Sequence, residues 1–270
     1  VANRLATAGI SYTEFSYQVL QAFDYLELYR RNDCKLQIGG SDQWGNIVAG
    51  LDLIRKVEGG SAHALTVPLL AKSDGSKFGK TASGAIWLDA TMTSAYEFFQ
   101  FWLNSDDADM PKLLKVFSMK DRKEIERLIE TVNTNPGARE AHRELAREMT
   151  TLIHGADMAK KVEEAAKALF GQGEISELDL ATLDSALSQL PKTQVKKGDP
   201  FPTWVDLLAA TGVVDSKSAA RRIVKEGGAY LNNKKVESED FTPSKSDLLH
   251  GKYLLLRKGK RDLAAVEVVA

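Results

Sequence analysis

The segment "KSDGSKFGKTASG", residues 72–84, combines lysines, hydroxyls and glycines in a pattern that could hold phosphate. Its Gly79-Lys80-Thr81 matches the end of the P-loop motif G-x-x-x-x-G-K-[ST]. The spacing disagrees, because three residues separate Gly75 from Gly79 where a P-loop has four. The segment "ASGAIWLD" that follows lacks the periodicity of an amphipathic helix. The segment is therefore a phosphate site of another kind, or a surface loop of small polar residues.

A second set of polar residues lies along one predicted helix. Apolar spacing in "SYTEFSYQVLQAFDYLELYRR" predicts this helix, and Tyr17, Gln21 and Asp24 follow at i, i+4 and i+7, on one side of it. A carboxylate beside the core needs a hydrogen-bond donor, so Asp24 suits a bound ligand. A solvated polar face is the alternative. The stripe that we expect to be buried comprises Phe15, Val19, Leu20, Phe23 and Leu26.

The stretch "QIGGSDQWGN" places two glycines, Asp42 and Gln43 after a short apolar run that predicts a strand. Glycine lets a ligand approach the backbone closely, and an aspartate at the carboxyl end of a strand suits a pair of ribose hydroxyls. A tight turn also explains Gly-Gly-Ser-Asp, and this stretch alone does not decide between the two.

The surrounding pattern predicts the elements that position these residues. A strand over "CKLQIGG", a helix over "GNIVAGLDLIRKV" and a strand over "ALTVPLL" follow the first helix. This order is typical of a parallel α/β sheet, which binds ligands at the carboxyl ends of its strands. We assign residues 1–90 to this part of the chain.

The rest of the chain divides into three further segments. Residues 91–187 are predicted to be helical, and Ser94 with Glu97 forms a capping box that starts a helix. Residues 188–200, "SQLPKTQVKKGDP", contain proline and lysine without periodicity, which predicts a linker. Residues 201–270 are expected to fold as a small separate α/β unit.

Composition and charge narrow the class of protein. A chain of 270 residues with 43% hydrophobic and 27% charged residues has room for about two domains. No apolar run approaches the roughly 20 residues of a membrane helix, and the one cysteine, Cys34, fits a reducing cytoplasm. Residues 201–270 hold twelve Lys/Arg and nine Asp/Glu, whereas the first 200 residues carry a net charge of −4. A locally basic tail favours a polyanionic partner, with a solvated basic face as the alternative.

Four motifs in order carry a resemblance to a known family: "GISYTEFSY", "LQIGGSDQWGNI", "KFGKT" and "AIWLD" followed by "TSAYEFFQFWLN". Together they resemble the bacterial tyrosyl-tRNA synthetases, which are class I aminoacyl-tRNA ligases. The similarity runs over essentially the whole chain. It implies an α/β protein: the second part of a Rossmann-like parallel-sheet catalytic domain, then an α-helical domain and a small α/β RNA-binding domain of the ribosomal-protein type.

The resemblance also implies roles for the polar residues. Asp24 is expected to accept the hydrogen bond of the tyrosine phenol, while Tyr17 and Gln21 hold its α-ammonium group. Gln43 is expected near the carboxylate and the α-phosphate, and Gly40 with Asp42 at the adenosine ribose.

The segment "KFGKT" resembles the mobile signature loop of class I synthetases. Lys77 and Lys80 are expected to neutralise the pyrophosphate of ATP while the tyrosine carboxylate attacks the α-phosphate, and the Thr81 hydroxyl to assist phosphate binding. Catalysis would rest on positioning and charge stabilisation. The family implies ATP as a substrate with Mg²⁺ on its phosphates, no bound prosthetic group and no metal site of the protein.

The tail resembles the small RNA-binding fold shared with certain ribosomal proteins and pseudouridine synthases. Basic side chains along a helix and its following strand can reach neighbouring phosphates of a folded RNA. The expected RNA-binding residues are Ser218, Arg221, Arg222, Lys225, Lys234 and Lys235. The partners implied are L-tyrosine, ATP and tRNA(Tyr), in a cytoplasmic homodimer without a membrane.

One motif of the family, H-x-G-H, does not occur, since none of the four histidines is so paired. We expect it to lie upstream of Val1, so that this chain is the C-terminal two-thirds of the enzyme and inactive by itself. The alternative is a stand-alone RNA-binding protein or an inactive synthetase remnant. Specificity for tryptophan is disfavoured because "GGSDQWGN" and the Tyr17, Gln21 and Asp24 set match the tyrosine enzymes.

Overall fold

The computed structural model describes residues 9–75, 78–81, 84–259 and 262–269. The chain divides into two compact units, with the boundary between Phe78 and Gly79.

The first unit contains a parallel pair of strands joined by a helix. Its elements are α2 (Tyr12–Asn32), β1 (Leu36–Gly40), a 3-10 turn η1 (Ser41–Gln43), α3 (Trp44–Glu58) and β2 (His63–Val67). β1 and β2 pair in register from Leu36↔His63 to Gly40↔Val67. Parallel neighbours need a crossover connection, and α3 supplies it. This is the strand–helix–strand order that the sequence predicts.

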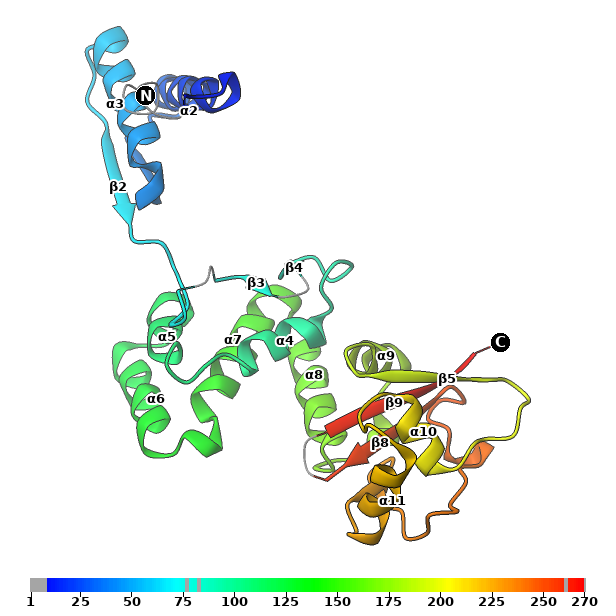
Figure 1. The fold of residues 1–270 in the computed structure, drawn as a ribbon. Coiled ribbons are helices and arrows are strands. Elements are labelled where there is room, and N and C mark those ends of the chain that lie inside the picture. The colour runs from blue at the N-terminus through cyan, green and yellow to red at the C-terminus, as the bar shows by residue number, and fades with distance from the viewer. Residues whose placement is uncertain (1–8, 76–77, 82–83, 260–261, 270) are drawn as a thin grey trace. The chain divides into compact units, whose positions relative to one another are not determined.

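Helix α2 packs on α3 through a small core around Tyr25, Leu26 and Ile54 (Figure 1). A Cβ at Gly50 of α3 would lie 2.8 Å from Cδ1 of Tyr25, so the close approach of the helices requires glycine there. The Tyr25 hydroxyl donates to the backbone carbonyl of His63 at 2.9 Å and ties α2 to the start of β2. Burial raises the pKa of Tyr25.

The prediction that the apolar stripe of α2 is buried is wrong for most of its residues. Phe15, Val19, Leu20 and Phe23 are 46–62% exposed, and Leu26 alone of the stripe is buried. The buried side of the helix consists of Ala22, Tyr25 and Leu26. These residues are buried because they lie on the side of α2 that packs against α3.

The second unit begins with a short hairpin and a helical segment. β3 (Lys80–Thr81) pairs antiparallel with β4 (Gly84–Ala85). The helices are α4 (Ala95–Leu103), α5 (Met110–Phe117), α6 (Arg122–Thr134), α7 (Glu140–His154), α8 (Ala156–Leu169) and α9 (Leu180–Ser188), with 3-10 turns η2 (Pro136–Ala138) and η3 (Ile175–Glu177). α4 packs on α7 and α8, and α7 on α6 and α8.

Side-chain caps fix where several of these helices begin. The Glu97 backbone N–H donates to Ser94 Oγ at 3.2 Å, which confirms the predicted cap of α4. Asp121 and Asp179 cap α6 and α9 in the same way. Each cap satisfies a backbone donor that the helix itself leaves unpaired, and it is visible in the sequence because it is local.

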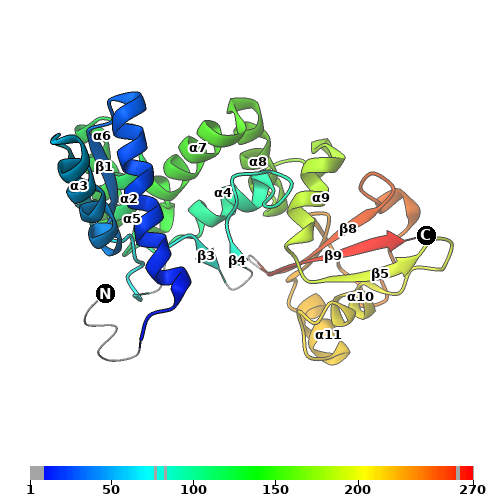
Figure 2. The same ribbon diagram turned by 90° about the horizontal axis from the view of Figure 1, so that it is seen from above.

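A five-stranded sheet of order β5-β9-β8-β6-β7 organises the tail. The strands are β5 (Lys192–Lys196), β6 (Ala229–Leu231), β7 (Lys234–Lys235), β8 (Tyr253–Lys258) and β9 (Asp262–Val269). The remaining elements are α10 (Trp204–Ala210), α11 (Lys217–Lys225) and the turn η4 (Lys245–Asp247). Helices α10 and α11 lie together beside this sheet (Figure 2).

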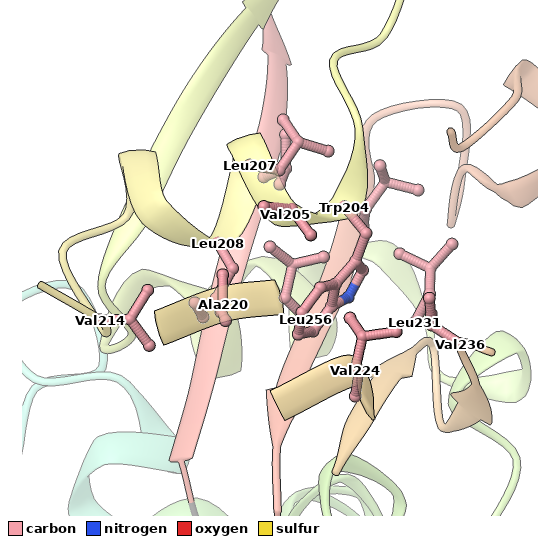
Figure 3. Close-up of a cluster of buried hydrophobic side chains, with 14 of the residues drawn as sticks. Trp204, Val205, Leu207, Leu208, Val214, Ala220, Val224, Leu231, Val236 and Leu256 are labelled. Carbon is pink, nitrogen blue, oxygen red and sulfur yellow. The ribbon is translucent and has the colours of Figure 1, made fainter. Parts of the chain in front are cut away.

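The core between these helices and the sheet centres on Trp204 (Figure 3). Its indole is fully buried and packs in a cluster that includes Val224, Leu231, Val236 and Leu256. The indole N–H donates to the backbone carbonyl of Tyr230 at 3.1 Å, so the polar atom of this side chain is satisfied. Trp204 therefore fastens α10 to strand β6.

The expectation of an aperiodic linker over 188–200 is wrong for its middle part. Residues Lys192–Lys196 form β5, which pairs parallel with β9 from Lys192↔Ala265 to Lys196↔Val269. The partner strand lies about 70 residues further along the chain, so no local pattern indicates this pairing. The edge strand of the tail's sheet thus lies before residue 201.

The second face of the sheet is buried against the helical segment. Tyr253, Leu255 and Ala265 are buried but lie outside the cluster around Trp204. Hydrogen bonds join the tail to helices α8 and α9. Asn233 Nδ2 donates to the carbonyl of Ala168 at 2.6 Å, and the Tyr253 hydroxyl donates to Asp184. This bond lowers the pKa of Asp184. The tail and the helical segment therefore share packed surface.

Candidate functional site

The first unit has an open hollow of about 500 Å³ at the carboxyl end of β1. Three of the residues that line it lie on the face of α2 that the sequence analysis singles out: Tyr17, Gln21 and Asp24. Gln43, predicted independently from the motif after the strand, completes the polar set. The remaining lining residues are Leu20, Ile38, Gly39 and Ile47. The structure thus brings the four predicted tyrosine-binding residues to one place.

The side chains of Gln21 and Asp24 make no hydrogen bond to the part of this unit that the structure describes. Asp24 can accept hydrogen bonds, and the Gln21 amide can both donate and accept. Ile47, which also lines the hollow, is fully buried. A hollow with an apolar floor and a few convergent polar groups is typical of a small-molecule site.

The amide of Gln43 is held on both sides by its neighbours. Its Nε2 donates to Asp42 Oδ2 at 3.1 Å, and Asn46 Nδ2 donates to its Oε1 at 3.1 Å. A side chain with both amide atoms bonded has little rotational freedom, so Gln43 presents a fixed edge to the hollow.

The two glycines of "QIGGSDQWGN" lie where neighbouring side chains leave little space for a Cβ. A Cβ at Gly39 would lie 3.0 Å from both Gln43 Cβ and Ile47 Cδ1, and one at Gly40 would lie 2.6 Å from Asp42 Oδ1. The sequence predicts Gly40 and Asp42 as ligand contacts. The packing role of Gly39, which lines the hollow itself, was not predicted, because it depends on side chains of the following helix.

The lysine loop is described only in part. Lys77 lies outside the described residues, and of Lys80 and Thr81 the backbone alone is described, as strand β3. Gly79 precedes them with φ +78°, in the left-handed region that favours glycine. A strand rather than a helix follows this glycine, which agrees with the rejection of a P-loop.

The predicted RNA-binding residues lie on two neighbouring elements of the tail. Ser218, Arg221, Arg222 and Lys225 are exposed on α11, whose N-terminus is capped by the Ser216 side chain. Lys234 and Lys235 form β7. The Lys235 ammonium lies 3.1 Å from the position of a Cβ at Gly227, directly after α11. The structure thus joins the two halves of the predicted basic cluster.

A second hollow, of about 490 Å³, lies beside β7 and was not predicted. Lys234, Lys235, Asp247 and His250 are among its lining residues. Asn232 turns the chain into β7 with φ +45°, and its amide bonds to the Asp247 carbonyl at 2.6 Å. The adjacent asparagines 232 and 233 are the signal of this turn in the sequence.

Two classes of feature were not found in the part of the chain that the structure describes. No three His, Cys, Asp or Glu side chains gather in a group that could hold a metal ion. None of the described helices has the length and apolar character needed to cross a membrane.

Family comparisons cover both units. Residues 1–171 match the family described as tRNA synthetases class I (W and Y), and residues 182–266 match the tyrosine–tRNA ligase SYY-like C-terminal domain. The chain is 60% identical over 270 residues to the tyrosine–tRNA ligase of Streptomyces avermitilis, covering 99% of this chain. It is 56% identical over 271 residues to that of Thermobifida fusca, covering 98% of this chain. The chain spans 63% of the length of each of these relatives.

Two solved structures of tyrosyl-tRNA synthetases are similar to the fold of this chain. A C-terminally truncated mitochondrial tyrosyl-tRNA synthetase from Aspergillus nidulans is 34% identical with a TM-score of 0.53, covering 63% of this chain and 49% of that one. The corresponding protein from Coccidioides posadasii is 34% identical with a TM-score of 0.51, covering 60% and 47%. The chain therefore belongs to the class I tRNA synthetases (W and Y), within the tyrosyl-tRNA synthetase family.

Proposed function

We propose that the protein to which this chain belongs is a tyrosine–tRNA ligase, which activates L-tyrosine with ATP and transfers it to tRNA(Tyr). The observation that carries the proposal is the hollow lined jointly by Tyr17, Gln21, Asp24 and Gln43. Its polar groups come from α2 and from the end of β1, and they are of the types that a phenol, an ammonium and a carboxylate require.

Within this proposal, Asp24 accepts the hydrogen bond of the substrate phenol, and Tyr17 and Gln21 hold the α-ammonium group. A bond to the phenol distinguishes tyrosine from phenylalanine, because phenylalanine would leave the carboxylate without its donor. Gln43, fixed by Asp42 and Asn46, holds the substrate carboxylate near the α-phosphate.

The adenosine ribose is proposed to lie at Gly40, the last residue of β1, and Asp42 in the turn that follows it. Helix α3 begins at Trp44, one residue after Gln43, and a helix N-terminus favours negative charge. A tyrosine carboxylate oxygen attacks the α-phosphorus, and pyrophosphate leaves. A ribose hydroxyl of the tRNA then attacks the tyrosyl carbonyl, and AMP leaves.

Lys77 and Lys80 are proposed to stabilise the pyrophosphate as its charge develops, with Thr81 donating to a phosphate oxygen. Mg²⁺ enters with the phosphates of ATP. We further propose the part up to about residue 90 as catalytic, 91–187 as the helical domain and the tail, which includes strand β5 as well as 201–270, as the RNA-binding domain. The complete protein would be a cytoplasmic homodimer and would contain the H-x-G-H motif.

The tail is proposed to bind tRNA through the basic cluster of α11 and β7. Arginine and lysine side chains that project from one helix and one adjacent strand can contact successive phosphates of a folded RNA. A net positive tail beside an acidic remainder directs a polyanion to this part of the chain.

The test is amino-acid-dependent exchange of pyrophosphate into ATP by the full-length protein, with tyrosine, tryptophan and phenylalanine in parallel. We expect exchange with tyrosine alone, followed by charging of tRNA(Tyr). Exchange with tryptophan would establish the sister specificity. Absence of exchange with every amino acid, together with tRNA binding, would establish the RNA-binding remnant.

A further inference from the structure

Acidic side chains neutralise most of the cations on α11. Lys217 Nζ lies 2.7 Å from Asp206 Oδ1. Arg221 Nε and Lys225 Nζ lie 3.7 and 3.2 Å from the two carboxylate oxygens of Glu239. Among the cations of this helix, Arg222 alone makes no ion pair within the described residues. The free tail therefore exposes much less unpaired charge on α11 than its sequence indicates.

Glu239 differs from Asp206, the other acid paired with α11, because its one carboxylate spans two cations of this helix. Arg221 and Lys225 are four residues apart, so their side chains are neighbours on one face of α11. Both cations are more than half exposed, whereas Glu239 is 31% exposed. The two cations that it neutralises belong to the face expected to meet RNA.

The backbone around Glu239 is fastened to the core. Val236, three residues before it, is buried. The backbone N–H of Phe241 donates to the carbonyl of Ser238 at 3.2 Å, and the backbone N–H of Trp204 donates to the carbonyl of Phe241 at 2.8 Å. The carboxylate is thus presented to α11 from a fixed turn. When a phosphate displaces it, the negative charge stays close to the site.

We infer that Glu239 masks Arg221 and Lys225 against RNA phosphates and thereby sets the affinity of the tail for tRNA. The inference rests on the proposed binding of tRNA by the tail. Exposed ion pairs are individually weak, so phosphates can replace the carboxylate. The displaced carboxylate then repels them. This balance keeps the complex reversible, which a ligase that must release its charged tRNA requires.

The test compares Glu239→Gln with Glu226→Gln in the 270-residue chain. Glu226 directly follows Lys225 and is exposed, and it makes no ion pair within the described residues. Both variants remove one negative charge beside the same helix, but Glu239→Gln alone frees two cations. Filter binding of a tRNA(Tyr) transcript between about 50 and 300 mM KCl, the range over which phosphate contacts weaken strongly, gives the affinity and its dependence on salt.

We expect Glu239→Gln to tighten binding about 3- to 10-fold at the lowest salt, with Glu226→Gln within about twofold. The slope of log affinity against log salt should steepen by up to about 1.4, from two contacts at about 0.7 each. Adding Arg221→Ala and Lys225→Ala to Glu239→Gln should abolish the gain. Glu239→Asp keeps the charge but shortens its reach, so a partial gain is expected.

Equal effects of Glu239→Gln and Glu226→Gln, or a gain that survives loss of Arg221 and Lys225, would overturn the masking while leaving tRNA binding established. Failure of the unsubstituted chain to bind tRNA would overturn the proposed function of the tail, and the masking with it. Thermal unfolding of each variant shows that the fold is retained. If Glu239→Gln fails to fold, the Glu239→Asp comparison decides.

Discussion

Gly39 is part of β1, and a Cβ there would lie 3.0 Å from both Gln43 Cβ and Ile47 Cδ1, so these side chains would have to shift. In the full-length protein, Gly39→Ala should push Gln43 away from the substrate and raise KM for tyrosine. Small displacements of a positioning group have large effects, and we expect about a 3- to 10-fold increase. Gly45→Ala is the matched control, since a Cβ there meets nothing within 4 Å. An equal KM in both variants would show that Gln43 is not a substrate contact.

The positions of single residues were predictable where they depended only on helical periodicity or on a short motif. Tyr17, Gln21 and Asp24 share the hollow because they share a helix face. The role of Gly39 and the ion pairs of Glu239 depend on contacts between segments that are separate in the sequence. Residue type and spacing alone do not indicate which acid meets which cation.

An ion pair joins α7 to α8 and predicts how stability depends on pH. Arg147 Nε and Nη2 each donate to Glu163 at 2.8 Å, and Lys167 Nζ lies 3.0 Å from it. The Arg147 hydrogen bond lowers the pKa of Glu163 from 4.5 to about 2. A pKa depressed by folding stabilises the folded state above pH 4.5, and this contribution is lost as the pH falls toward 2.

Glu163→Gln should therefore lower the free energy of unfolding at pH 7 by roughly 2 kcal/mol, after allowance for the half-exposed Arg147. The difference from the unsubstituted chain should vanish near pH 2. Glu164→Gln is the control, because its exposed pair with Lys160 spans 3.9 Å. Urea unfolding at several pH values measures both. A constant difference across this range would contradict the assigned pKa.

At the scale of elements, the helices were predictable because caps and apolar periods are local, as Ser94 shows for α4. Strand β5 was not, because its partner β9 lies far along the chain and its sequence has no strand pattern. The apolar stripe of α2 was misassigned for a related reason. Periodicity shows that a face is apolar but not which side a neighbouring helix covers.

At the scale of the whole molecule, the proposed function places amino-acid activation and tRNA binding in separate parts of the chain. Because β5 belongs to the sheet of the tail, the tail is best removed after Ser188. The full-length protein without residues 189–270 should lose at least about tenfold in charging of tRNA(Tyr), since it loses most phosphate contacts. Formation of tyrosyl-adenylate should stay within about twofold, because the proposed sites for tyrosine and ATP lie outside the tail. Equal losses in both reactions would show that the tail serves the catalytic fold instead.

The central claim is that the hollow beside α2 recognises tyrosine through its phenol. The most direct measurement is kcat/KM for tyrosine-dependent and phenylalanine-dependent pyrophosphate exchange by the full-length protein and its Asp24→Asn variant. Loss of a hydrogen bond to a charged group should lower kcat/KM for tyrosine about 10- to 100-fold and leave the value for phenylalanine within about threefold. An unchanged ratio of the two values would contradict the assignment of Asp24 and of the hollow.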